Sequence, residues 1–293
     1  MKTSNNWVIF DGNITPANRP VVPVVSRGLM YGDGIFETLR TYKGKTVLFE
    51  DHIARLHSGM CILGMKVDPE LKIGAIKEQL RKLLKKQQLL STDAIVRMQV
   101  WRDGQRGYHP QDKSDIHYSI TASVCPDNFS TPTLATVDRR RVPSRSIPSS
   151  VKFTNGINYI LAAQEAAERG GDDALMQTID GFISETTIAN IFWVKGNTIF
   201  TPDEECDLIP GITRNIVLEI IEKSNRWKYK EGKYYLDHLL DADAVWICNS
   251  VREVLAVETV NNQDFAVDHP VIGELQNRYT QFRRDNGNLL KRN

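Results

Sequence analysis

The chain has 293 residues, a length for which two domains are expected. Its residues are 41% hydrophobic and 25% charged, a composition typical of a soluble globular protein. Its 37 basic and 36 acidic residues nearly cancel, which excludes a strong field that would attract nucleic acid or an anionic membrane. The four cysteines show no C-x-x-C spacing and the N-terminus no signal-peptide pattern. We therefore expect a cytoplasmic protein with a small-molecule partner, no structural zinc and no disulfide framework.

The first part of the chain alternates predicted strands and helices. Alternating apolar residues predict strands over residues 34–42, 46–49, 95–101 and 116–124. A helix is expected over residues 51–63, and a second helix begins at Pro69 with Asp68 as its N-cap. A hairpin followed by two helices and two further strands is the expected order.

A stretch rich in Pro, Asp, Asn, Ser and Thr, residues 126–133, predicts an interdomain linker. Beyond it, strands are expected over residues 174–178, 182–183, 191–194, 198–201 and 244–248. Helices are expected after Lys152, over residues 211–224 and at the C-terminus. The basic run 139–141 is interpreted as surface charge. The chain is thus α+β, with helices set against mostly antiparallel sheets.

Six segments carry patterns that occur together, in this order, in one enzyme family. They are RGLMYGDGIFET over residues 27–38, HIARL over 52–56, Lys152, ISETTIANIF over 183–192, PGITR over 210–214 and CNS over 248–250. The chain resembles the fold type IV pyridoxal-phosphate enzymes, which include branched-chain aminotransferases, D-amino acid aminotransferases and aminodeoxychorismate lyases. The resemblance implies a small α/β sandwich-like domain over residues 1–125. The linker 126–133 would lead to a larger cofactor-binding domain over residues 134–293, with a mostly antiparallel sheet or barrel and flanking helices.

The resemblance implies pyridoxal 5'-phosphate as cofactor and gives two residues its central chemistry. Lys152 would form the internal aldimine and then shuttle the proton between the substrate α-carbon and the cofactor. Glu185 would keep the pyridine nitrogen protonated, so that the ring accepts electrons. Taken singly, each side chain would be ordinary surface decoration, and only the joint pattern supports these roles.

The resemblance also implies a phosphate site at the start of the helix that follows Pro210. Backbone amides at a helix N-terminus favour an anion. The cofactor-binding residues implied are Arg55, Lys152, Glu185, Ile212, Thr213, Asn249 and Ser250.

Substrate recognition is less defined by these patterns. Tyr31 and Phe36 would wall the substrate pocket, in the family often across a dimer interface, so the resemblance implies a homodimer with shared active sites. A substrate carboxylate requires a guanidinium, which either Arg97 or Arg106 could supply. Arg97 lies in a strand similar to that of branched-chain aminotransferases, although Ile95 stands where many of those enzymes have tyrosine.

Other positions resemble the lyases more closely. These are Thr38 and the pair Arg106 and Tyr108, and the residues after Lys152 are similar to those of lyases and D-amino acid aminotransferases. The PGITR segment favours an aminotransferase instead. Val251 and Arg252 place a large cation where branched-chain enzymes have small residues, so Arg252 would bind a second carboxylate or point to solvent.

The sequence predicts a pyridoxal-phosphate aminotransferase that moves an amino group from an α-amino acid, most simply a branched-chain one, to a 2-oxo acid. One alternative is an aminodeoxychorismate lyase that forms 4-aminobenzoate and pyruvate. A D-amino acid aminotransferase is a second alternative. A non-catalytic relative that binds an anion or a protein is a third, against which the joint presence of Lys152, Glu185 and Arg55 argues.

Overall fold

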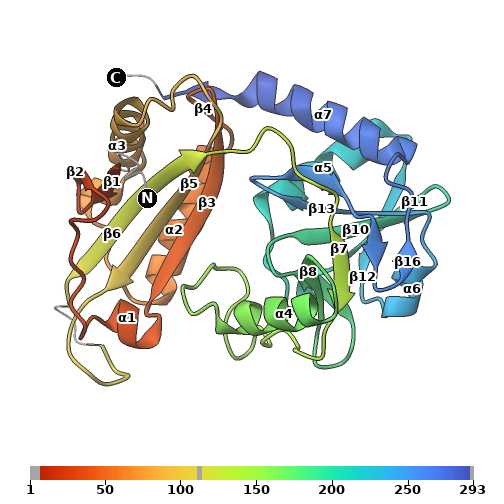
Figure 1. Cartoon of the computed structure of the whole chain (residues 1–293), viewed down its shortest axis with the longest axis horizontal. Coiled ribbons are helices and arrows are strands. Elements are labelled where there is room, and N and C mark those ends of the chain that lie inside the picture. Colours follow the sequence, from red (N-terminus) through yellow and green to blue (C-terminus); the bar gives the residue numbers. More distant parts are fainter. Residues whose placement is uncertain (1–6, 111–113, 291–293) are drawn as a thin grey trace. The chain divides into compact units, whose positions relative to one another are not determined.

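The computed structural model describes residues 7–110 and 114–290, which form two compact units (Figure 1). Unit 1 comprises Met1–Asp127, Val151–Asn155 and Asn286–Asn293, and unit 2 comprises Asn128–Ser150 and Gly156–Asp285. The chain therefore returns to unit 1 for five residues that include Lys152. Patterns of apolar residues and turns do not indicate that five residues of the second half belong to unit 1. The domain boundaries predicted from the sequence, 1–125 and 134–293, stay a prediction.

Unit 1 contains a seven-stranded antiparallel sheet in the order β17-β4-β3-β5-β6-β1-β2. Its strands are β1 (Trp7–Phe10), β2 (Asn13–Pro16), β3 (Gly34–Tyr42), β4 (Lys45–Thr46), β5 (Ala94–Arg102), β6 (Ile116–Val124) and β17 (Asn288–Leu289). The predicted strands 34–42 and 116–124 are confirmed. The predicted strand 46–49 is wrong beyond Thr46, because the next helix already begins at Phe49.

The helices of unit 1 are α1 (Arg27–Tyr31), α2 (Phe49–Ile62), the 3-10 turn η1 (Pro69–Leu71) and α3 (Ile73–Lys86). The apolar sides of α2 and α3 share one core with alternate residues of β3 and β5, such as Ile35, Leu39 and Val96. The intervening residues of these strands, Phe36 and Arg97 among them, are only partly buried. The prediction of one helix from Pro69 is wrong, because Lys72 has an extended backbone that separates η1 from α3.

Unit 2 is built on a larger sheet in the order β12-β11-β10-β9-β8-β7-β15-β16, with β13 paired to β10 and to β14. Its strands are β7 (Thr133–Thr136), β8 (Asp173–Gln177), β9 (Ile183–Thr186), β10 (Asn190–Lys195), β11 (Thr198–Pro202), β12 (Lys228–Gly232), β13 (Ala244–Asn249), β14 (Glu253–Ala256), β15 (Thr259–Val260) and β16 (Gln263–Asp264). The antiparallel run from β8 to β11 confirms the predicted meander. Within the described residues these strands do not close into a barrel.

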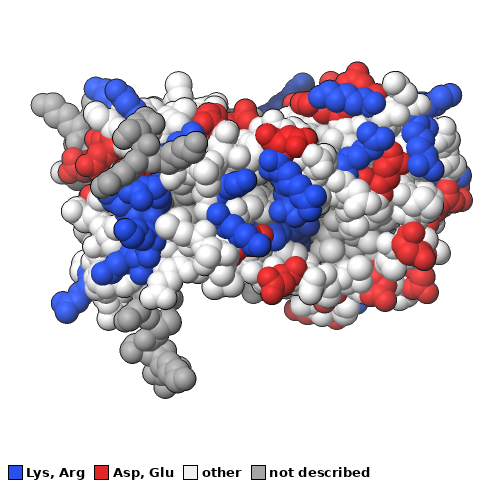
Figure 2. Space-filling model, turned by 90° about the horizontal axis from the view of Figure 1, so that it is seen from above, with Lys and Arg blue, Asp and Glu red and all other residues white. Residues whose placement is uncertain are grey.

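The helices of unit 2 are α4 (Ile157–Glu168), η2 (Glu204–Cys206), α5 (Ile212–Ser224), α6 (Leu236–Leu240) and α7 (Pro270–Asn286). Fully buried aromatic and aliphatic residues of β10 and β13, Trp193 and Ile247 among them, form much of the core. Such a core gives the loops that leave these strands a rigid base. The face drawn in Figure 2 carries basic and acidic side chains interspersed. None of the helices in the described part of the chain is long and apolar enough to span a membrane.

Candidate active site

Lys152 is placed by a short pairing with the start of β3 in unit 1. The Phe36 amide donates to the Lys152 carbonyl at 2.8 Å, and the Thr154 amide donates to the Gly34 carbonyl at 2.9 Å. Ile35 and Phe153 form an antiparallel bridge between these two bonds. The backbone on either side of Lys152 is therefore fixed to the sheet, and its amine lies 5.6 Å from the centroid of the Phe36 ring.

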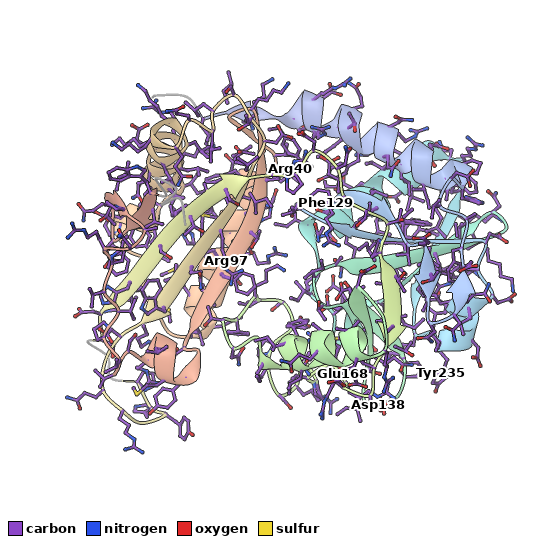
Figure 3. The ribbon with its side chains drawn as sticks, viewed as in Figure 1. Arg40, Arg97, Phe129, Asp138, Glu168 and Tyr235 are labelled. Atoms are coloured by element: carbon purple, nitrogen blue, oxygen red, sulfur yellow. The ribbon has the colours of Figure 1, made fainter. Side chains whose placement is uncertain are left out.

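Arg97 lies on β5, directly opposite Thr38 of β3, and can be located in Figure 3. Its guanidinium lies 3.8 Å from the centroid of the Phe36 ring. Burial lowers the pKa of Arg97, because desolvation disfavours the charged form. Within the described ranges, its side chain has no hydrogen bond and no ion pair. Arg97 thus offers the fork of donors that a carboxylate needs.

Arg55, on α2, is held by a buried carboxylate. Its Nε donates to Glu37 Oε1 at 2.6 Å and its Nη2 to Glu37 Oε2 at 3.0 Å. His52 Nδ1 lies 2.8 Å from the same Oε2. Burial alone would raise the pKa of Glu37, but the hydrogen bonds from His52 and Arg55 outweigh it and lower the pKa to about 2. Glu37 is therefore a fixed negative charge that orients the Arg55 guanidinium.

The other candidate substrate residues of unit 1 lie around α1 and the loop 103–108. The Tyr31 hydroxyl accepts a hydrogen bond of 3.0 Å from the Gly107 amide, and the Tyr31 and Tyr108 ring centroids are 5.4 Å apart. Arg106 is exposed, and 90% of Tyr108 is exposed. The candidate substrate residues of unit 1 thus form two groups. One group lies on α1 and the loop and contains Tyr31, Arg106 and Tyr108. The other lies on the sheet and contains Phe36, Thr38 and Arg97.

Glu185, on β9 of unit 2, is buried, and its partners include Arg141, Tyr159 and the Ile209 backbone. Arg141 Nε lies 3.1 Å from Glu185 Oε1, and the Tyr159 hydroxyl donates to the same oxygen at 2.8 Å. The Ile209 amide donates to Oε2 at 3.0 Å. Burial and the negative charge of Glu185 raise the pKa of Tyr159, so this phenol stays a donor.

The interpretation of residues 139–141 as surface charge is wrong for one of the three arginines. Arg139 is largely exposed, but Arg141 is buried against Glu185 and also donates to the Asp207 carbonyl at 3.2 and 3.0 Å. Its guanidinium lies 4.5 Å from the centroid of the Tyr159 ring. A buried carboxylate on a neighbouring strand gives Arg141 a partner that the local sequence does not reveal.

The first turn of α5 has the features of an anion site. The helix begins after Gly211, which has no side chain to cap it, so its first amides are open to an acceptor. A Cβ on Gly211 would lie 2.1 Å from Asn190 Oδ1, so only glycine fits here without a shift. Asn190 Nδ2 donates to the Ile209 carbonyl at 2.8 Å, which holds the approach to the helix.

A second hydroxyl joins this helix start from the turn after β13. Thr213 Oγ1 and Ser250 Oγ are 3.4 Å apart. Asn249 builds this turn, because its Oδ1 accepts from the amides of Val251 at 2.9 Å and Arg252 at 2.7 Å. The Arg252 guanidinium lies 5.7 Å from the centroid of the Phe129 ring. Ile212, Thr213 and Ser250 are thus grouped, and Asn249 orients the turn that carries Ser250.

Four residues that contact the candidate site residues were given no role in the site by the sequence analysis: Glu37, His52, Arg141 and Tyr159. Glu37 did leave a signal, because it occupies an inward position of β3 between Ile35 and Leu39, where a charge needs a partner. His52 lies one helical turn before Arg55 and faces the same way. The partnership of Arg141 and Tyr159 with Glu185 depends on tertiary contacts alone.

The donors present fit pyridoxal phosphate. An uncapped helix start with two hydroxyls suits a phosphate, and a buried carboxylate suits a protonated ring nitrogen. The fold and these residues define a cofactor-dependent enzyme of the pyridoxal-phosphate class. The chain belongs to the amino-transferase class IV family, whose model matches residues 34–260. This confirms the predicted family, its enzymatic nature and its pyridoxal-phosphate cofactor.

Relatives with different activities are about equally similar to the chain. It is 30% identical over 290 residues to branched-chain-amino-acid aminotransferase-like protein 2 of Arabidopsis thaliana, which covers 96% of this chain but only 50% of that protein. The chain thus spans about half of the length of this plant relative. It is 29% identical to the aminodeoxychorismate lyase of Vibrio harveyi, over 88% of this chain and 93% of the lyase.

A solved structure shares the fold across nearly the whole chain. The branched-chain amino acid aminotransferase of Thermobaculum terrenum, in its pyridoxal-phosphate form, superposes with a TM-score of 0.87. The alignment covers 99% of this chain and 100% of that one, at 19% identity. At this identity the likeness concerns the fold, and the predicted two-sheet α+β architecture is confirmed.

Proposed function

We propose that this protein is an aminotransferase that moves an amino group from an α-amino acid to a 2-oxo acid in two half-reactions. A branched-chain amino acid is the substrate that we propose, because relatives named as branched-chain-amino-acid aminotransferases or aminotransferase-like proteins match 95–96% of this chain. The observation that carries the proposal is Arg97, a desolvated guanidinium without an anionic partner in the described part of the chain, beside the same ring as Lys152. Both substrates of a transamination bring the carboxylate that such a cation favours.

Pyridoxal phosphate, when bound, supplies the electron sink for cleavage of a bond at the substrate α-carbon. The residues of the chain then bind and orient it. Within unit 2, the Ile212 and Thr213 amides and the Thr213 and Ser250 hydroxyls would hold the phosphate. For Arg55, a role in phosphate binding is what the resemblance to the family implies. A Glu185 carboxylate oxygen would accept a hydrogen bond from the protonated ring nitrogen and so keep that nitrogen protonated.

Lys152 Nζ is the amine that would hold the cofactor and would move the proton at the substrate α-carbon. The bonds that pin the Lys152 backbone to β3 limit the positions that Nζ can take. Phe36 lies beside this amine and beside Arg97, so the reacting amine and the proposed carboxylate-binding cation would contact the same ring.

A lyase acting on aminodeoxychorismate is the second candidate. The specific observation in its favour is that Thr38 lies directly opposite Arg97 in the β3–β5 register, which places a hydroxyl beside the candidate anion site. The sequence around Arg106 and Tyr108 and the Vibrio harveyi relative add support. A D-amino acid aminotransferase would use the same residues on an amino acid of the opposite configuration at its α-carbon.

We further propose that the protein is a cytoplasmic homodimer. Large apolar side chains are exposed on α1 and on the segment before it. They include Val21 and Val24, each 80% exposed, and Leu29, 64% exposed. Large apolar side chains exposed close together in sequence are candidates for burial against another chain. A second copy of this chain is the partner that we infer, and light scattering of the purified protein tests it, since a monomer at micromolar concentration would contradict the proposal.

A parallel assay of three substrate classes tests the proposed reaction. L-amino acids with 2-oxoglutarate, D-amino acids with the same acceptor, and aminodeoxychorismate alone would be supplied to the holoenzyme. We expect 2-oxo acid formation from branched-chain L-amino acids. Turnover of D-amino acids only, or release of pyruvate and 4-aminobenzoate from aminodeoxychorismate only, would replace the proposal with the corresponding alternative.

A further inference from the structure

Arg27, the first residue of α1, is a buried arginine that the proposed reaction does not use. It is 4% exposed, and its Nε donates to Asp33 Oδ2 at 2.7 Å. Arg102 Nη1 lies 3.7 Å from the same oxygen. The ion pair with Asp33 accounts for only part of the guanidinium, which has five N–H donors in a rigid fork.

The other donors of Arg27 are directed at the backbone of the loop 103–108. Nη1 donates to the Gln105 carbonyl at 3.2 Å and also to the Gly107 carbonyl, and Nη2 lies 3.4 Å from the Tyr108 carbonyl. One guanidinium thus binds three carbonyls within four consecutive residues. Since the loop has no strand or helix of its own, these bonds replace regular secondary structure.

The loop and its base are shaped to accept this side chain. Gly104 and Gly107 have φ values of 125° and 124°, which L side chains rarely adopt. A Cβ on Gly104 would lie 2.9 Å from Ser114 Oγ, and Arg27 Cδ is 3.6 Å away. On α1, a Cβ on Gly28 would lie 2.6 Å from Trp101 Cδ1, so the helix that carries Arg27 sits directly on β5.

The loop carries two of the candidate substrate residues, Arg106 and Tyr108. Arg106 lies between the two carbonyls that Arg27 Nη1 binds, and Tyr108 supplies the third carbonyl. The Tyr31 hydroxyl, on the same short helix, accepts the Gly107 amide at 3.0 Å. The direction in which Arg106 and Tyr108 project is therefore set from α1.

We propose that Arg27 is a positioning residue for substrate specificity, which fixes the loop 103–108 and through it the Arg106 guanidinium and the Tyr108 ring. The inference rests on the proposed function, because it takes the loop as part of substrate recognition. Lysine cannot replace Arg27 in this role. A single ammonium beside Asp33 keeps the charge but does not span three carbonyls.

Limited proteolysis measures the loop directly, without reference to activity. Between Arg102 and Ile116 the sequence contains one arginine, Arg106, so an arginine-specific protease reports opening of the loop. Cleavage after the exposed Arg145 is the internal reference. We expect Arg27→Lys and Arg27→Gln to accelerate cleavage after Arg106 by about tenfold or more, because each loses several charge-assisted hydrogen bonds.

A matched control separates loop anchoring from general destabilisation. Leu84→Ala removes a fully buried side chain of α3 that has no part in the loop. The Leu84→Ala protein should be cleaved after Arg106 at the wild-type rate, even if its Tm falls as far as the Tm of the Arg27→Lys protein. Should Arg27→Gln not fold, Arg27→Lys carries the test, because it keeps the charge beside Asp33. Equal cleavage in wild type and Arg27→Lys, or equal acceleration in Leu84→Ala, would overturn the anchoring role.

Steady-state kinetics then test the specificity role. For Arg27→Lys we expect KM for the amino acid to rise about tenfold, with kcat and the affinity for pyridoxal phosphate within about twofold of wild type. A fall in kcat with unchanged KM would overturn the role in substrate positioning. Absence of aminotransferase activity in the wild type would contradict both the proposed function and this specificity role. The cleavage experiment would still decide whether Arg27 anchors the loop.

Discussion

The Arg97 guanidinium stacks on the Phe36 ring at 3.8 Å from the ring centroid, and this contact is the only interaction recorded for its side chain among the described residues. Stacking on an aromatic ring stabilises a guanidinium but leaves its donors unused. Burial lowers the pKa of Arg97, so an anion that restores the lost solvation is favoured. A substrate carboxylate is the anion that the proposed reaction supplies.

Replacing Arg97 with glutamine should impair substrate binding specifically. We expect KM for the amino acid to rise by about tenfold to hundredfold, because a charge-assisted bidentate contact is lost. Fluorescence titration should show unchanged affinity for pyridoxal phosphate. Arg40→Gln is the matched control, since Arg40 lies on the neighbouring strand but is paired with Asp93 at 2.6 Å. An equal rise in KM in both variants would argue against a dedicated role for Arg97.

Glu37 should make stability depend on pH in the acidic range. Its pKa falls from 4.5 in the unfolded chain to about 2 in the folded protein. A carboxyl whose pKa is lowered by folding stabilises the protein above its unfolded value, and this stabilisation is lost as the pH falls through the folded value. The shift corresponds to about 3 kcal/mol, of which about 2 kcal/mol should be lost on going from neutral pH to about pH 3.

Urea unfolding of wild type and Glu37→Gln at the two pH values measures this contribution. At neutral pH the variant should be less stable by about 3–5 kcal/mol, because Arg55 and His52 lose a buried partner. The gap between the two proteins should narrow at about pH 3. Glu78→Gln, which breaks a surface pair with Arg81, should differ from wild type by at most about 1 kcal/mol at either pH. A gap that is constant with pH would contradict the ionised state of Glu37.

Thr213→Val should weaken binding of the phosphate group and of nothing else. We expect the Kd for pyridoxal phosphate to rise about tenfold, because one hydroxyl donor is removed while the side-chain shape is kept. The Kd for pyridoxal, which lacks the phosphate, should stay unchanged. Thr201→Val is a suitable control, because the Thr201 hydroxyl donates to the Ile191 carbonyl within the sheet. An equal loss of affinity for both compounds would place Thr213 away from the phosphate.

Gly211→Ala should damage the same site through packing. The new Cβ would meet Asn190 Oδ1 at 2.1 Å, so Asn190 must move and its bond to the Ile209 carbonyl is strained. We expect a loss of about 1–3 kcal/mol in the free energy of unfolding and weaker cofactor binding. In Gly273→Ala of α7 nothing lies within 4 Å of the new Cβ, and a gain of about 0.5–1 kcal/mol is expected. Thermal unfolding with and without the cofactor compares the two.

Local patterns predicted most of the strands, because alternation over 34–42 and 116–124 reflects sheets with one buried face. They failed at β12, whose sequence Lys228–Gly232 is mostly polar and pairs at the edge of the sheet next to β11. They also failed at Lys72, where Pro69 satisfied the rules for a helix start but began only a 3-10 turn. Such choices depend on tertiary packing.

The residues of the candidate site also fall into two groups, those that sequence motifs predict and those that depend on tertiary contacts. Lys152, Arg55, Glu185 and Thr213 were named from motifs, because the proposed chemistry requires particular residue types at particular places in the order of segments. The residues that bind and orient these side chains were not predicted from motifs. Arg141 reaches Glu185 from 44 positions earlier in the chain, and Arg27 reaches the loop from 78 positions or more away, so no local pattern could pair them.

A single-turnover experiment with mass detection of the cofactor tests whether Lys152 and its partners carry out transamination. Holoenzyme would be mixed with a branched-chain L-amino acid and no acceptor. We expect stoichiometric conversion of pyridoxal phosphate to pyridoxamine phosphate with one equivalent of 2-oxo acid, and no conversion in Lys152→Ala. Unconverted cofactor in the wild type, together with pyruvate release from aminodeoxychorismate, would contradict it.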